Sequence, residues 1–212
     1  MKMKLHILTA MIWLSGISVT MAQVVASAGS TIEGSPYLNE SYADAEIHYV
    51  KGNRTKLPAR YNAYQDLIEY KQNGRSFVID PATNIKKINL GNETFVVDKL
   101  DENGKIKYGF LTLLDSGKVT LLSKKSIAYA EAKLTKAMDG TEVNAPAKFS
   151  KLPDTYYYKI GNGELQKFKN IKKMIESFPD KQDELTKYVK KEKISSRDEA
   201  ELIKFVRYYN SL

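Results

Sequence analysis

Hydrophobic and polar residues alternate in short segments from about residue 36 to about residue 168, and Gly, Asn, Asp and Pro separate the segments. This alternation, with Val, Ile, Tyr and Phe at the hydrophobic positions, is typical of strands with one buried face. It predicts strands at residues 44–51, 57–63, 66–71, 75–80, 85–90, 93–100, 105–114, 118–125, 127–134, 155–160 and 164–168. Because the connections are short, we expect an antiparallel β meander that closes into a barrel-like roll or forms a sandwich.

After residue 169 the hydrophobic period becomes that of a helix. Asn170 is placed to cap a first helix that ends at Pro179, and Ser196 with Glu199 forms a capping box that opens a third. The one-sided apolar positions of the three helices are Ile171, Met174, Ile175 and Phe178, then Leu185, Tyr188 and Val189, then Leu202, Ile203, Phe205, Val206 and Tyr209. One-sided helices need a partner surface, so residues 169–212 should pack on the β domain 36–168. The predicted fold class is α+β.

Two segments lack a regular period. Residues 23–35 are rich in Ala, Ser, Gly and Thr, which predicts a flexible leader. Residues 135–154 include Asp139-Gly140 and Ala145-Pro146 and form the longest stretch without a clear element. Within the β domain, we expect this stretch to be a mobile surface loop and the first place to look for a lid or a partner contact.

Residues 1–22 have the layout of a secretory signal peptide. Lys2 and Lys4 precede an uncharged apolar segment, and Thr20 and Ala22 place small residues before a cleavage site after Ala22. The alternative, a retained membrane anchor, is less favoured because the segment is at the lower length limit for a spanning helix and contains several polar residues. We expect export to the periplasm, the outer envelope or the extracellular space, with no transmembrane segment after cleavage.

The absence of cysteine limits the possible chemistry. A chain without cysteine has no disulfides, no lipid-carrying cysteine and no thiolate metal site, so a lipoprotein is excluded. Of the two histidines, His6 lies in the predicted signal peptide, and His48 alternates with Ile47 and Tyr49 as an ordinary strand residue would. We therefore predict no metal, no cofactor and no catalytic residue.

The formal net charge is +8 at pH 7, but acidic residues are interspersed with the basic ones. Such mixing is typical of a solvated surface, and export argues against nucleic acid as the partner. A cell-envelope glycan or protein is the expected partner, and a phosphate-bearing glycan would suit the excess of lysine.

Two kinds of side chain could form a site in such a chain. Paired carboxylates could serve a glycan hydrolase, and Asp66, Glu69 and Asp80 are candidates, although Asp80-Pro81 is more typical of a turn. Tyrosine is abundant, with 14 residues. Tyrosine faces bind sugars and protein partners, or simply fill a core. The candidate ligand-binding residues are Arg60, Tyr61, Tyr64, Tyr156 and Tyr158.

The opening segment at residues 34–40, Gly-Ser-Pro-Tyr-Leu-Asn-Glu, resembles that of a group of uncharacterised exported proteins of Bacteroidota-type bacteria. Residues 57–64, 66–70, 92–97 and 178–212 are similar to the same group. The resemblance covers nearly all of the chain after residue 22. It implies the periplasm or outer envelope of a Gram-negative cell, and it implies no activity, cofactor or catalytic residue.

These observations favour an exported, non-enzymatic binding or interaction protein of the cell envelope. Its ligand would be a glycan, a lipopolysaccharide head group or an envelope protein. The alternatives are a carboxylate-based glycan hydrolase and a structural accessory subunit of an envelope assembly. A hydrolase requires two carboxylates in one concave pocket, with the pKa of at least one strongly shifted. A glycan binder requires a shallow groove floored by coplanar tyrosine rings, with polar side chains at its rim.

Overall fold

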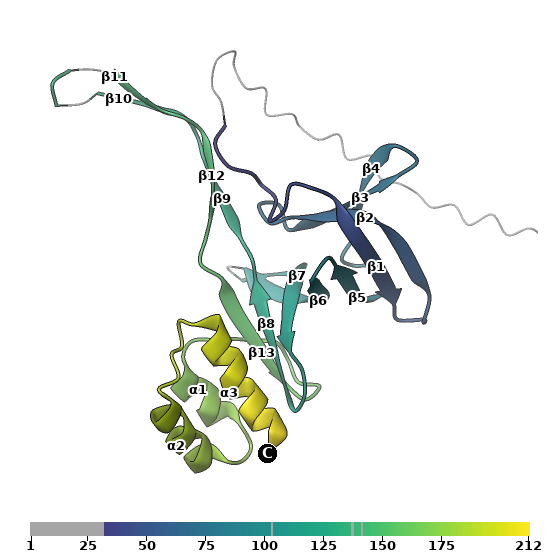
Figure 1. Ribbon diagram of the computed structural model, residues 1–212, viewed down its shortest axis with the longest axis vertical. Helices are drawn as coiled ribbons and strands as arrows, with labels where there is room; N and C mark the ends of the chain where they lie inside the picture. The colour runs from purple at the N-terminus through teal and green to yellow at the C-terminus, as the bar shows by residue number, and fades with distance from the viewer. Residues whose placement is uncertain (1–31, 103, 137, 141) are drawn as a thin grey trace, which may run out of the picture.

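The computed structural model describes residues 32–102, 104–136, 138–140 and 142–212. The predicted signal peptide and residues 23–31 of the predicted leader lie outside the described residues. The described chain is an antiparallel β structure followed by three helices (Figure 1), so the predicted α+β class is confirmed. Within the described residues, no helix combines the length and the apolar character needed to cross a membrane.

Ten strands form one sheet, in the order β14-β13-β8-β7-β6-β5-β1-β2-β3-β4, and every neighbouring pair is antiparallel. Their bounds are β1 Ala43–Tyr49, β2 Arg54–Asn62, β3 Leu67–Gln72, β4 Arg75–Ile79, β5 Ile85–Leu90, β6 Glu93–Glu102, β7 Lys105–Asp115, β8 Val119–Lys124, β13 Thr155–Ile160 and β14 Gln166–Lys167. The sheet curls into a half-barrel (Figure 1), which is nearer to the barrel-like roll than to the sandwich.

The curl joins two meanders. The strands β1 to β4 form one meander and β5 to β8 the other, and they meet where β1 pairs with β5, with Ile47 opposite Ile88. The register shifts between His48 and Tyr49 in this pair, and again near Leu113 in the pair of β7 with β8. Such irregularities increase the local twist of a sheet, which favours curling.

A hydrophobic core fills the inside of the curl. Tyr61 lies at its centre, with ring centroids 4.9 Å from Phe95 and 6.4 Å from Phe110. Branched residues such as Ile47, Ile68 and Ile88 surround the rings and are almost completely buried. The period-two pattern of the sequence therefore corresponds to the concave face of the sheet.

Residues 127–151 form an arm that projects from the body of the protein (Figure 1). At its base, β9 (Ile127–Ala130) pairs with β12 (Lys148–Lys151), and further out β10 (Lys133–Lys136) pairs with β11 (Glu142–Ala145). The expectation of an irregular loop at residues 135–154 is therefore wrong in its secondary structure, and the strand predicted at 127–134 is two strands. Whether the arm moves stays a prediction. The sequence did not reveal the ribbon because Pro146 and Gly140 interrupt its alternation.

The helices are α1 (Ile171–Ser177), α2 (Gln182–Glu192) and α3 (Glu199–Ser211), and they pack with Val119, Leu121 and Tyr158 of β8 and β13. Asn170 caps α1 as predicted, accepting a hydrogen bond from the Lys173 N–H at 2.9 Å. The predicted Ser196 cap is wrong. Asp198 caps α3 instead, because its carboxylate accepts from the Glu201 N–H at 3.1 Å.

Candidate functional site

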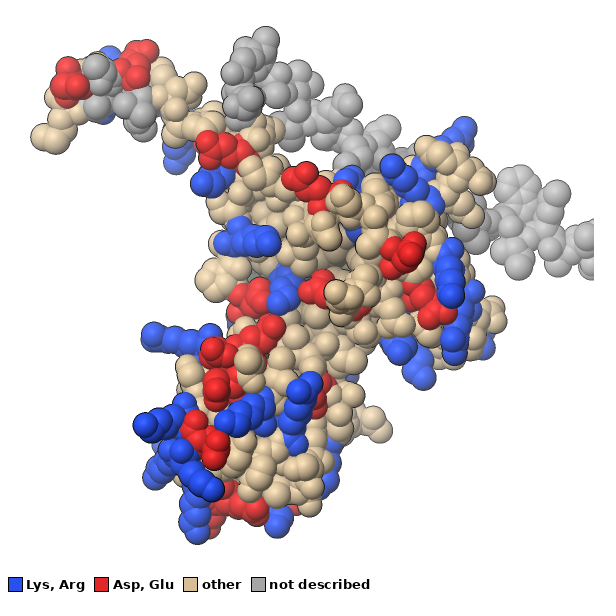
Figure 2. All heavy atoms as spheres, in the orientation of Figure 1, with Lys and Arg blue, Asp and Glu red and all other residues tan. Residues whose placement is uncertain are grey.

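A cavity of about 520 Å³ opens between the curled sheet and the base of the arm. We call it the waist cavity. Polar groups from five separate parts of the chain line it, namely Asn39, Ser41, Arg60, Asn92, Glu93, Lys125, Ser126, Lys151 and Asp154. Leu38, Leu90 and Leu152 supply an apolar part of the wall. Figure 2 shows acidic and basic side chains side by side over the middle of the molecule, between the helices and the upper strands.

Lys125 is the central charge at the cavity. Its Nζ lies 2.5 Å from Asp154 Oδ2 and 3.4 Å from Glu199 Oε2, so it joins the segment just before β13 to the start of α3. Burial by itself would lower the pKa of Lys125. The hydrogen bond and the charge of Asp154, together with Glu199, outweigh burial and raise the pKa above its ordinary value. The raised pKa favours the cationic form of Lys125 between these two acidic side chains.

Glu93, at the start of β6, is a half-buried carboxylate of the cavity. Burial raises the pKa of Glu93, Lys125 opposes the shift, and Asp154 and Glu199 add to it. Its carboxylate forms no hydrogen bond or ion pair with another described residue. Glu93 is thus a partly desolvated acid without a close partner, facing a cavity.

Tyr156 belongs to the same group of charges. Burial raises the pKa of its phenol, and the neighbouring carboxylates of Glu199 and Asp154 raise it further. This predicted ligand-binding residue therefore lies beside the charged cluster, while its ring packs against Phe168 at a centroid distance of 6.4 Å.

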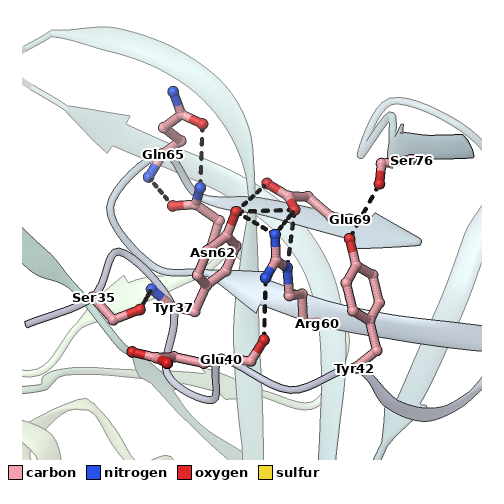
Figure 3. A network of polar contacts seen from close by, with 9 residues as sticks. All are labelled: Ser35, Tyr37, Glu40, Tyr42, Arg60, Asn62, Gln65, Glu69 and Ser76. Carbon is pink, nitrogen blue, oxygen red and sulfur yellow. Dashed lines mark hydrogen bonds and ion pairs between the residues drawn. The ribbon is translucent and has the colours of Figure 1, made fainter. Parts of the chain in front are cut away.

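Arg60, another predicted ligand-binding residue, is occupied by contacts within the protein (Figure 3). Its Nε and Nη2 donate to Glu69 Oε2 at 3.1 and 2.9 Å, and its guanidinium lies 3.6 Å from the ring centroid of Tyr37 and 4.6 Å from that of Tyr42. Nη1 also donates to the carbonyl of Glu40 at 3.1 Å. Arg60 therefore attaches residues 37–42 to the sheet, and its charge is balanced by buried Glu69.

Tyr61 and Tyr158 are both buried, so they do not form an exposed tyrosine surface. The Tyr61 hydroxyl donates to Asp66 Oδ1 at 2.8 Å, and burial raises its pKa strongly, as does the charge of Asp66. The Tyr158 hydroxyl lies 2.9 Å from Gln166 Oε1 and 3.0 Å from Ser177 Oγ, between the sheet and α1. The first belongs to the core of the curl and the second to the core under the helices.

Tyr64 is exposed, with 47% of its surface accessible. Its ring centroid lies 5.3 Å from that of Phe149 and 6.2 Å from that of Tyr129, both in the arm. We call these three residues the arm-base aromatic cluster. Phe149 and Lys151 are two residues apart on β12 and so share one face of the strand, which places the cluster next to the waist cavity.

The candidate carboxylates Asp66, Glu69 and Asp80 have other roles. Asp66 pairs with Lys124, and Glu69 pairs with Arg60. Asp80 Oδ1 accepts from the Ala82 N–H at 2.8 Å, so the turn interpretation is confirmed. The carboxylates at the cavity are Glu93 and Asp154, which sequence reasoning missed. They lie 61 positions apart, and no motif links them.

No three His, Asp or Glu side chains of the described ranges are grouped so that they could hold a metal ion. No protein family matches the chain, and no curated protein or solved structure is significantly similar to it. The geometry of the site is therefore the basis for a functional proposal.

Proposed function

We propose that this protein is an exported, non-enzymatic binding protein of the cell envelope and that the waist cavity holds its ligand. The observation that carries the proposal is the cavity itself, about 520 Å³ in volume, lined by the Glu93 carboxylate, which has no hydrogen-bond or ion-pair partner among the described residues. Small-molecule sites are typically concavities of several hundred Å³ with a few polar groups that orient the ligand. Export and the envelope compartment are supported by residues 1–22 and by the resemblance to exported proteins of Bacteroidota-type bacteria.

A glycan is the ligand class that fits best. The cavity offers amide, hydroxyl and charged groups, and the arm-base aromatic cluster beside it offers the exposed ring of Tyr64. Sugars combine hydroxyl groups with apolar ring faces, so they bind where polar groups and an aromatic ring lie together. A ligand of two or more sugar units would cover the cavity and the ring at once.

The test is a glycan array followed by titration of the best glycan against the protein expressed from its full-length coding sequence. Tyr64→Ala should weaken binding about fivefold, since a stacking aromatic ring contributes roughly 1 kcal/mol. Tyr108→Ala is the matched control, because Tyr108 is 48% exposed but lies on β7 and does not line the cavity. Equal affinity of the two variants, or no glycan bound at all, would contradict the proposal.

A glycan hydrolase is the second candidate, favoured by one specific observation. Glu93, whose pKa is raised by burial, and Asp154, which pairs with Lys125, line the same cavity. Retaining and inverting glycosidases use a pair of carboxyl groups, one of which has a raised pKa. Release of reducing ends from the bound glycan, abolished by Glu93→Gln, would favour the hydrolase over the binding protein.

A further inference from the structure

Most charges that line the waist cavity are neutralised inside the protein. Lys125 is shared between Asp154 and Glu199, and Arg60 is paired with Glu69. Two lining side chains have no such partner. The side chains of Glu93 and Lys151 form no hydrogen bond or ion pair with any other residue in the part of the chain that the structure describes.

The two side chains have opposite charges and come from different walls of the cavity. Glu93 follows the turn between β5 and β6, whereas Lys151 ends β12 at the base of the arm. The charge of Lys151 lowers the pKa of Glu93 slightly against the effect of burial. The Lys151 ammonium nitrogen and the Glu93 carboxylate oxygens are nevertheless more than 4.0 Å apart, so the two side chains do not form a salt bridge. The cavity thus presents one negative and one positive group at separate places.

We infer that the ligand of the waist cavity carries both an ammonium group, which Glu93 binds, and an acidic group, which Lys151 binds. The inference rests on the proposed function and narrows its ligand class to an amino sugar with an acidic substituent. A neutral sugar would leave the half-buried Glu93 without compensation for its lost water. A ligand with only acidic groups would face the carboxylates of Glu93 and Asp154, and one with only amines would face Lys151.

The partial burial of Glu93 supports this assignment. Burial raises its pKa, which means that the free protein disfavours the ionised form. An ammonium group at hydrogen-bond distance would favour the ionised form and offset that cost. Lys151 is exposed, so it can reach toward an acidic group without losing much hydration.

Four sugars that differ by one group each test the inference. They are glucose, glucosamine, glucose 6-phosphate and glucosamine 6-phosphate, titrated against the protein expressed from its full-length coding sequence and followed by NMR shifts of cavity residues. Each matched charge should improve affinity by about tenfold. Glucosamine 6-phosphate should therefore bind most tightly.

Two isosteric or near-isosteric variants assign the groups. Glu93→Gln should remove the advantage of glucosamine over glucose but keep that of the phosphate, and Lys151→Gln should do the reverse. Glu131→Gln and Lys133→Gln are the controls, because both residues are exposed on the arm and do not line the cavity. These two variants should keep both advantages.

Each unfavourable outcome has a distinct meaning. Equal binding of all four sugars at cavity residues overturns the inference while the proposed function stands. An advantage of amine and phosphate that survives Glu93→Gln and Lys151→Gln also overturns it. If none of the four sugars shifts a cavity residue, the inference fails, and the glycan array decides the proposed function separately.

Discussion

Lys124 and Lys125 are neighbours in the sequence, but they act in two different clusters. Lys124 is buried at the end of β8, where it pairs with Asp66 and donates to the Phe110 carbonyl at 3.1 Å. Lys125 is half-buried and pairs with Asp154 and Glu199 beside the waist cavity. Lys124 is the last residue of β8 and Lys125 is the first residue after it, so these neighbouring lysines belong to different clusters.

Glu93 should lower the stability of the ligand-free protein at neutral pH. Burial raises its pKa, so the folded state binds the proton more tightly than the unfolded state does. The stability that the protonated Glu93 contributes is therefore fully present below the ordinary pKa of a glutamate. It is lost as the pH rises through the higher pKa that Glu93 has in the folded protein. Glu93→Gln, which cannot ionise, should show a larger free energy of unfolding than the wild type at pH 7.

Urea unfolding at several pH values measures this effect. The difference between Glu93→Gln and the wild type should disappear as the pH falls to about 4, where both carry a neutral side chain. Glu131→Gln, at an exposed position of the arm, should show no such pH-dependent difference. A difference that stays constant with pH would contradict the desolvation of Glu93.

At the scale of elements, a side chain of α3 attaches this helix to the sheet by bonding backbone groups that a neighbouring strand would otherwise bond. Asn210 Oδ1 accepts from the Val119 N–H at 2.8 Å, and Asn210 Nδ2 donates to the Val119 carbonyl at 2.9 Å and to Asp115 Oδ1 at 3.0 Å. A Cβ on Gly117 would lie 2.6 Å from Asn210 Cγ, so only glycine leaves room for this amide. The start of β8 therefore has its backbone groups satisfied by a helix.

Asn210→Ala should destabilise the protein by about 2 kcal/mol, because the backbone groups of Val119 lose their partners. Ser211→Ala is the neighbouring control, since the Ser211 hydroxyl donates to the Tyr208 carbonyl of its own helix. Chemical denaturation of both variants measures the difference. Similar stabilities would show that the apolar contacts of α3 hold it without the amide.

At the scale of the whole molecule, the curl is closed by Tyr61, Asp66, Phe110 and Lys124, which we call the closure cluster. Asp66 lies in the turn between β2 and β3, yet its Oδ1 accepts from the Phe110 N–H of β7 at 3.3 Å. Lys124 bonds the Phe110 carbonyl and pairs with Asp66. The cluster therefore links strands that lie at distant places in the sheet order.

Lys124→Met should lower the free energy of unfolding by about 3 kcal/mol, because it leaves the carboxylate of Asp66 buried without its cation. Adding Asp66→Asn should recover part of the loss, since the remaining polar group is neutral. Lys99→Met, at an exposed position of β6, is the control and should change stability by less than about 0.5 kcal/mol. Urea unfolding of the three variants measures these values, and a Lys124→Met protein as stable as the control would contradict the closure role.

The sequence by itself determined most strands of the sheet, the helices, their buried faces and the Asn170 cap. These features depend on local periodicity and turn chemistry, which single segments display. Three features were not predictable in this way: the pairing of β1 with β5, the ribbon of the arm, and the separation of the tyrosines. The curled sheet covers Tyr61, the helices cover Tyr158, and Tyr64 is exposed, because tertiary packing and not composition decides which ring is covered.

The waist cavity was decided only by the tertiary structure. Glu93, Lys125, Lys151 and Asp154 each look like an ordinary charged residue of a solvated strand or loop. They share a site because the curl and the arm bring five separate segments around one space. The desolvation of Glu93 and the pairing of Lys125 exist only in that arrangement, since burial and charge separation are properties of distances in space rather than along the chain.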